Sequence, residues 1–135
     1  MSQITWDSSY SVGIQKIDEQ HKKLINLINH LDAAVGKGQG SAMQGDLIME
    51  LAEYLMDHFG MEEALMDKYG YPQYDAHLQI HHSFTRKVKE FRDDIAAGSL
   101  SVSEEALVFL GDWLINHIQA TDKLLGDYLR EQGEV

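Results

Sequence analysis

Residues 58–82 read HFGMEEALMDKYGYPQYDAHLQIHH. A Gly-Tyr-Pro break in this stretch separates two amphipathic helical patterns, the first with His58 and Glu62 and the second with His77 and His81. The members of each pair are four residues apart, so on a helix they point to the same face. Because a short connection makes neighbouring helices antiparallel, the stretch predicts a helical hairpin in which both pairs lie near the connection.

Further breaks rich in glycine lie on either side of this hairpin, at 36–40 and 98–101. Together with the break at 70–72 they divide the chain into four helical segments. The predicted starts of these segments lie near Asp18, Ser41, Pro72 and Ser101. Each segment carries apolar residues at steps of three and four, the spacing that turns one helix face inward. The sequence therefore predicts an all-α fold, an up-down-up-down antiparallel four-helix bundle.

The first 17 residues contain apolar side chains without sustained helical spacing. We expect residues 1–17 to form an extended N-terminal arm over the bundle, with Trp6 as a packing anchor. A chain of 135 residues is long enough for one core and short for two. Residues 1–135 are therefore expected to form a single domain.

Histidine and carboxylate side chains occupy core positions of the helical stripes, where they are costly unless something binds them. In an antiparallel bundle, the start of the first and third helices and the later parts of the second and fourth share one half. The polar core residues fall in that half. The predicted metal ligands are His21, His58, Glu62, His77, His81, His117 and Asp122.

These residues also have a structural interpretation. A single histidine on an apolar stripe is more often a hydrogen-bonded core residue than a ligand, and His21 alone would be interpreted in that way. The two pairs favour a metal site, because both members of each pair face inward. His30 and His82 lie about 180° and about 100° around their helices from His21 and His81, so neither is assigned to the site.

His117 and Asp122 are five residues apart, which places them about 140° apart on a regular α-helix. Either Asp122 reaches around the helix, or the helix widens. The apolar stripe through Leu114 and His117 shifts by one residue beyond this point, so we predict a π-bulge near residues 118–121. The alternative is that Asp122 is a surface residue near the end of the last helix.

Composition excludes several classes of protein. The absence of cysteine rules out thiolate zinc sites, iron–sulfur clusters, disulfides and cysteine nucleophiles. A formal charge of −11 is the wrong sign for nucleic acid or anionic lipid. The sequence has no apolar run long enough for membrane insertion and no pattern of a signal peptide, so a cytoplasmic protein is expected.

Four short motifs resemble those of the hemerythrin family, in particular its single-domain bacterial members. The motifs are DEQH at 18–21, HFGMEE at 58–63, HLQIH at 77–81 and WLINHIQATD at 113–122. Each motif alone is modest, but all four in this order are specific, and the resemblance spans nearly the whole chain. It implies a four-helix bundle and an oxygen-binding iron centre.

The chemistry of the ligand set agrees with a pair of irons. Seven ligands are too many for one tetrahedral zinc, and imidazole with carboxylate suits iron, although zinc or manganese is a lower-ranked alternative. The resemblance implies two iron ions bridged by an oxo or hydroxo group and by two carboxylates, Glu62 and Asp122. It assigns three histidines to one iron and two to the other, which keeps one position open for dioxygen. The three are His77, His81 and His117, and the two are His21 and His58.

An oxygen carrier needs a dry, apolar pocket around the open position. Candidates that flank the ligands in sequence are Phe59, Trp113, Leu114 and Ile118, and the alternative is that they are ordinary core residues. The predicted function is reversible dioxygen binding for storage, delivery or buffering of oxygen by a monomer. The expected partners are dioxygen and a protein that receives the oxygen. Two alternatives are a sensor acting through a partner and an enzyme reducing oxygen, peroxide or nitric oxide. The E-x-x-H motif of ferritin-like oxidases is absent from the sequence, which favours binding over an enzyme.

Overall fold

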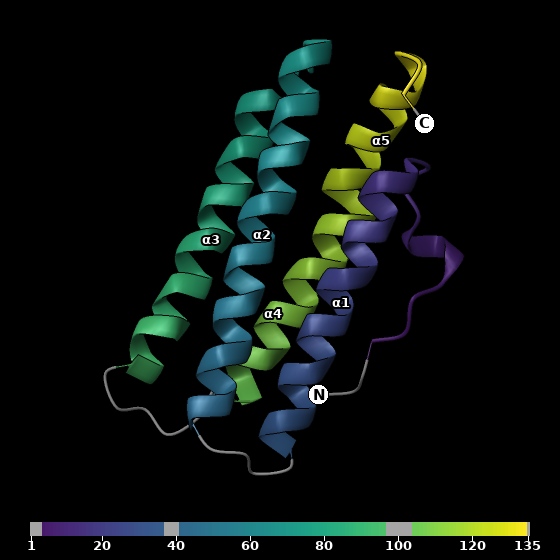
Figure 1. The fold of residues 1–135 in the computed structure, drawn as a ribbon. Coiled ribbons are helices and arrows are strands. Elements are labelled where there is room, and N and C mark those ends of the chain that lie inside the picture. Colours follow the sequence, from purple (N-terminus) through teal and green to yellow (C-terminus); the bar gives the residue numbers. More distant parts are fainter. Residues whose placement is uncertain (1–3, 37–40, 97–103, 135) are drawn as a thin grey trace.

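The computed structural model describes residues 4–36, 41–96 and 104–134. These residues form an antiparallel bundle of four helical rods (Figure 1), which confirms the predicted fold class. The elements are η1 (Ser8–Tyr10), α1 (Gln15–Gly36), α2 (Ser41–Tyr69), α3 (Tyr74–Ala96), α4 (Glu104–Asn116), the π-helical η2 (His117–Asp122) and α5 (Lys123–Glu131). The fourth rod is the continuous run of α4, η2 and α5. The breaks predicted at 36–40 and 98–101 fall almost entirely outside the described residues.

Helix α1 begins three residues earlier than the sequence pattern predicted. It starts at Gln15, so the prediction of an arm through residue 17 with Asp18 as the helix cap is wrong. The apolar stripe of α1 in fact extends back through Ile17 and Ile14, which continue the steps of three and four and are fully buried. The arm therefore ends at residue 14.

Asp18 forms hydrogen bonds with the arm and does not cap the helix. Its carboxylate accepts hydrogen bonds from the backbone N–H of Val12 at 2.8 Å and from the hydroxyl of Ser11 at 2.6 Å. Farther along the arm, the backbone of Ile4 exchanges two hydrogen bonds with the side chain of Asn29 on α1. For the described residues 4–14, the prediction of an arm lying over the bundle is confirmed.

A glycine C-cap forms the turn between α2 and α3. Gly70 has a φ of +62°, and the N–H of Tyr71 donates to the carbonyl oxygen of Met66 at 2.9 Å. This six-residue hydrogen bond is the Schellman arrangement, which satisfies the last carbonyls of a helix and requires a left-handed residue. The turn reverses the chain, so the end of α2 and the start of α3 lie side by side, as predicted for residues 58–82 (Figure 1).

The buried apolar side chains form two clusters. The larger one fills the half of the bundle that holds the end of α1 and the start of α2, and it includes Leu24, Leu51, Phe84 and Leu110. The smaller one joins the arm to the ends of α2 and α5. Its members are Val12, Ile14, Ile17, Met66, Tyr71, Leu125 and Leu129. Between the two clusters lies a layer of polar side chains.

Some large apolar side chains remain at the surface. Met49 and Met56 are exposed on α2, Val108 and Phe109 on α4, and Leu124 on α5. Within the described ranges, no helix has the length and apolar character needed to cross a membrane.

Candidate metal centre

The polar layer consists of the seven residues that the sequence predicted as ligands. On α1, His21 lies between Ile17 of the small cluster and Leu24 of the large one. The other helices repeat this order, so the layer is closed by hydrocarbon on both sides. No member is more than 3% exposed: His21, His58, Glu62, His77, His81, His117 and Asp122. By contrast, His30 and His82, which were not assigned to the site, are exposed.

Asp122 lies between two sets of imidazoles. Its Oδ1 is 2.9 Å from Nε2 of His117 and 3.1 Å from Nε2 of His77. Its Oδ2 is 2.7 Å from Nε2 of His21 and 4.0 Å from Nε2 of His58. A single carboxylate therefore presents one oxygen to each set.

Glu62 is the second carboxylate shared by both sets. Its Oε1 is 3.0 Å from Nε2 of His81 and 3.6 Å from Nε2 of both His77 and His58. The donor atoms form two overlapping groups that each lie within 4.8 Å, and both groups contain Glu62 and Asp122. One group adds His77, His81 and His117, and the other adds His21 and His58. This is the same division that the resemblance implies.

A π-helical turn brings His117 and Asp122 to the same side of their rod. The segment His117–Asp122 is π-helical, so the prediction of a π-bulge near residues 118–121 is confirmed. In an i to i+5 turn, residues five apart share a face, whereas on a regular α-helix they diverge. The alternative that Asp122 is a surface residue is wrong, because its side chain is fully buried.

Two residues that were not predicted as part of the site, Gln20 and Glu63, accept hydrogen bonds from imidazole nitrogens that face away from the layer. Nδ1–H of His58 donates to the side-chain oxygen of Gln20 at 2.6 Å. Nδ1–H of His81 donates to the carboxylate of Glu63 at 3.3 Å. Such bonds fix the tautomer that leaves the Nε2 lone pair facing the layer. Both residues are neighbours of a ligand in the motifs DEQH and HFGMEE, but helical spacing alone gave no signal for them.

The side chains of the layer do not satisfy all of one another's hydrogen-bonding groups. Ten buried nitrogen and oxygen atoms of these seven side chains have no hydrogen-bond partner. A buried polar group without a hydrogen bond costs about 1–3 kcal/mol, so a layer with this many such atoms is unfavourable unless a ligand binds it. Metal ions would satisfy the Nε2 and carboxylate atoms, and nitrogen with oxygen donors suit iron. The residues present therefore fit a metal centre.

Comparison with known proteins agrees with this chemistry. The family model named "Hemerythrin HHE cation binding domain" matches residues 12–129. The chain belongs to the hemerythrin family. It is 37% identical to a bacteriohemerythrin of Stenotrophomonas maltophilia (strain R551-3) and 39% identical to one of Pseudomonas aeruginosa (strain LESB58). Each alignment covers 96% of this chain and 84% of the relative.

A solved structure shows the same fold. A crystal structure of wild-type hemerythrin matches with a TM-score of 0.88 at 29% sequence identity, covering 95% of this chain and 98% of that chain. The family, the fold and the buried donor cluster together identify a hemerythrin-type iron protein.

The charges of the hemerythrin layer are distributed unevenly in the metal-free protein. Burial lowers the pKa of His58 to about 4. Burial also acts to lower the pKa of His77, but Asp122 and Glu62 outweigh it and raise the pKa to about 8. The same two carboxylates raise the pKa of His117 to about 10 against its burial. Burial opposes ionisation of Glu62, yet the surrounding imidazoles hold its pKa well below the usual value.

Aromatic and aliphatic side chains enclose the imidazoles of this hemerythrin. The ring of Phe59 stacks on His81 at 3.9 Å between centroids, and the ring of Trp113 stacks on His117 at 4.5 Å. Leu114 and Ile118 are almost fully buried in the large cluster. All four residues named by the sequence analysis therefore lie in the apolar surroundings of the layer.

A cavity of about 400 Å³ reaches the layer at His77. Residues of the α2–α3 turn, α3, η2 and α5 line it: Tyr71, Gln73, Ala76, His77, Ile80, Ala120, Thr121 and Leu124. The ring of Tyr71 lies 6.3 Å from that of His77, edge to face, and burial raises the pKa of the Tyr71 hydroxyl. This side of the layer was not predicted from the sequence, because most of the residues that line the cavity lie off the apolar stripes.

Proposed function

We propose that this hemerythrin binds dioxygen reversibly at a non-haem di-iron centre, for storage, delivery or buffering of oxygen. His77, His81 and His117 would hold one iron, and His21 with His58 would hold the other. The two carboxylates and an oxo or hydroxo group would bridge the ions. The observation that carries the proposal is the pair of overlapping donor groups that share Glu62 and Asp122.

The donor count gives the two irons different roles. Three imidazoles would hold the first iron and two would hold the second, so the second iron would have room for dioxygen. Two ferrous ions in this arrangement would supply the electrons that reversible binding of dioxygen requires. The open position would lie on the side of His21 and His58.

The protein's own side chains would keep this position dry and aprotic. Gln20 accepts the Nδ1–H of His58 and holds it away from the layer. We propose that Phe59, Trp113, Leu114 and Ile118 form the apolar wall of the oxygen pocket. A site walled by hydrocarbon excludes water and supplies no proton, which favours binding over turnover.

The test is a cycle of oxygenation on the reduced, iron-loaded protein. Admission of oxygen should produce a visible absorption band, and removal of oxygen should abolish the band without loss of iron. His58→Ala should lower the iron content and remove the band, whereas the matched control His30→Ala, an exposed histidine on α1, should change neither. Continuous consumption of oxygen with added reductant would overturn the proposal in favour of an enzyme.

A further inference from the structure

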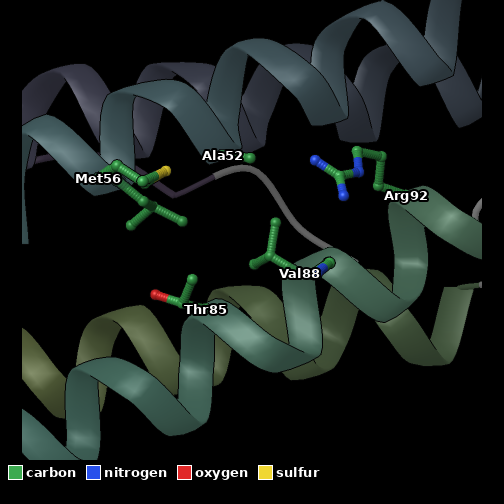
Figure 2. Close-up of a pocket in the computed structure, with 7 residues that line it drawn as sticks. Ala52, Met56, Thr85, Val88 and Arg92 are labelled. Atoms are coloured by element: carbon green, nitrogen blue, oxygen red, sulfur yellow. The ribbon is translucent and has the colours of Figure 1, made fainter.

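A second cavity lies between α2 and α3, apart from the metal layer. Its volume is about 300 Å³. Figure 2 shows Ala52 and Met56 on one helix facing Thr85, Val88 and Arg92 on the other, with the Arg92 side chain reaching over the space between them. The complete lining is Ala52, Leu55, Met56, Thr85, Val88, Lys89 and Arg92.

The floor and walls of this cavity are apolar. Leu55 and Val88 form its base and belong to the large core cluster. The small side chain of Ala52 leaves space between the helices, and Met56, which is 67% exposed, stands at the rim. The hydroxyl of Thr85 donates to the carbonyl oxygen of His81 at 2.9 Å, so its donor is already used. Methionine adapts its shape to apolar ligands, so these walls suit a hydrocarbon chain.

The rim carries positive charge in a protein that is otherwise acidic. Lys89 and Arg92 line the cavity, and none of its seven lining residues is acidic, although the chain has twice as many acidic as basic residues. Among the described residues, Arg92 pairs only with the exposed Asp93, at 3.5 Å, and no acidic partner pairs with Lys89. Two cations beside an apolar cavity are the complement of an anionic headgroup on a hydrocarbon chain.

We propose that this cavity binds a small amphipathic anion, a carboxylate with an alkyl chain. The chain would lie between Ala52 and Val88, and the carboxylate would accept hydrogen bonds from Arg92 and Lys89. A volume of about 300 Å³ is at the small end of ligand pockets, which favours one such molecule over a larger cofactor. This site is independent of the proposed oxygen chemistry.

The test measures binding of decanoate to the full, iron-loaded chain by calorimetry. Decanoate should bind saturably with one molecule per chain. Decanol, which lacks the charge, and acetate, which lacks the chain, should each bind at least about tenfold more weakly. Absence of saturable decanoate binding would overturn the proposal. Binding to vesicles of anionic phospholipid without binding of free decanoate would also overturn it, in favour of a membrane surface.

Variants locate the site. Arg92→Glu should weaken decanoate binding by at least about tenfold, whereas Lys16→Glu, an equal change of charge at an exposed position of α1 outside the cavity, should leave it unchanged. Ala52→Leu and Ala52→Phe should reduce binding in order of size, because they fill the cavity. Far-UV circular dichroism and iron content check that each variant is folded. Binding that survives both Arg92→Glu and Ala52→Phe would contradict the assignment.

Discussion

The sequence predicts the role of some residues of the metal layer but not of others. Paired spacing and the family motifs predicted the seven polar side chains that the structure brings together. Asp122 required one further step, recognition that five residues fit a π-turn. The roles of Gln20 and Glu63 were not predicted, because each is a polar residue next to a ligand in the sequence. Only the fold shows which imidazole nitrogen each of them contacts.

The contact of Glu63 with His81 gives a prediction for metal affinity. Glu63→Ala should lower iron affinity by about 10–100-fold, because the imidazole loses the partner that orients it. Glu63→Gln, which keeps an acceptor without the charge, should recover part of this loss. Competition with a chelator measures the affinity, and Glu53→Ala, an exposed position on the same helix, is the matched control. Equal affinities for Glu63→Ala and Glu53→Ala would show that the hydrogen bond has no role.

The uneven charges of the layer predict release of protons on metal binding. At pH 7 the metal-free protein holds protons on His77, with a pKa of about 8, and on His117, with a pKa of about 10, but not on His58. A metal ion binds only the neutral imidazole, so it must displace these protons. Metal affinity should therefore rise as pH increases from 7 through 8. Calorimetry in buffers of different ionisation enthalpy counts the protons, and a count near zero at pH 7 would contradict this distribution of charge.

At the level of secondary-structure elements, periodicity predicted the four rods and the hairpin turn. It misplaced the start of α1, because an aspartate at a plausible cap position masked the continuation of the stripe through Ile14 and Ile17. The partner of Asp18 is the arm, and contact between distant segments is invisible to local spacing. The close approach of the arm to α5 at Gly126 could not be predicted for the same reason.

Gly126 tests how the arm is held. A Cβ at this position would overlap the backbone and side chain of Val12, so Gly126→Ala should displace the arm and destabilise the protein by about 1–3 kcal/mol. Gly60 is the matched control, because it is also within a helix and a Cβ there meets nothing within 4 Å. Gly60→Ala should stabilise the protein by up to about 1 kcal/mol. Chemical denaturation measures both, and equal effects of the two substitutions would refute the packing of the arm on α5.

At the level of the whole molecule, the bundle is two apolar clusters joined through a polar layer. Sequence predicted the bundle, the location of the layer in one half and the identity of its side chains. It could not predict the division of the core into two clusters, because that division depends on the arm folding back to Val12 and Ile14. The layer interrupts the core, so stability of the whole bundle should depend on what fills the layer.

Removal of iron therefore tests the layer as a structural element. The metal-free protein should unfold at a temperature at least about 10 °C lower than the loaded protein, because buried donor atoms lose their partners. Scanning calorimetry of both forms measures the difference. Addition of iron should restore the original Tm. An unchanged Tm after removal of iron would mean that the layer is satisfied without metal.

Anomalous diffraction at the iron edge from crystals of the loaded protein is the most direct test of the di-iron centre. Two iron peaks should appear within the layer, with Glu62 and Asp122 between them and His21 and His58 on the iron that keeps an open position. A single peak, or imidazoles of the layer that bind no iron, would contradict the account.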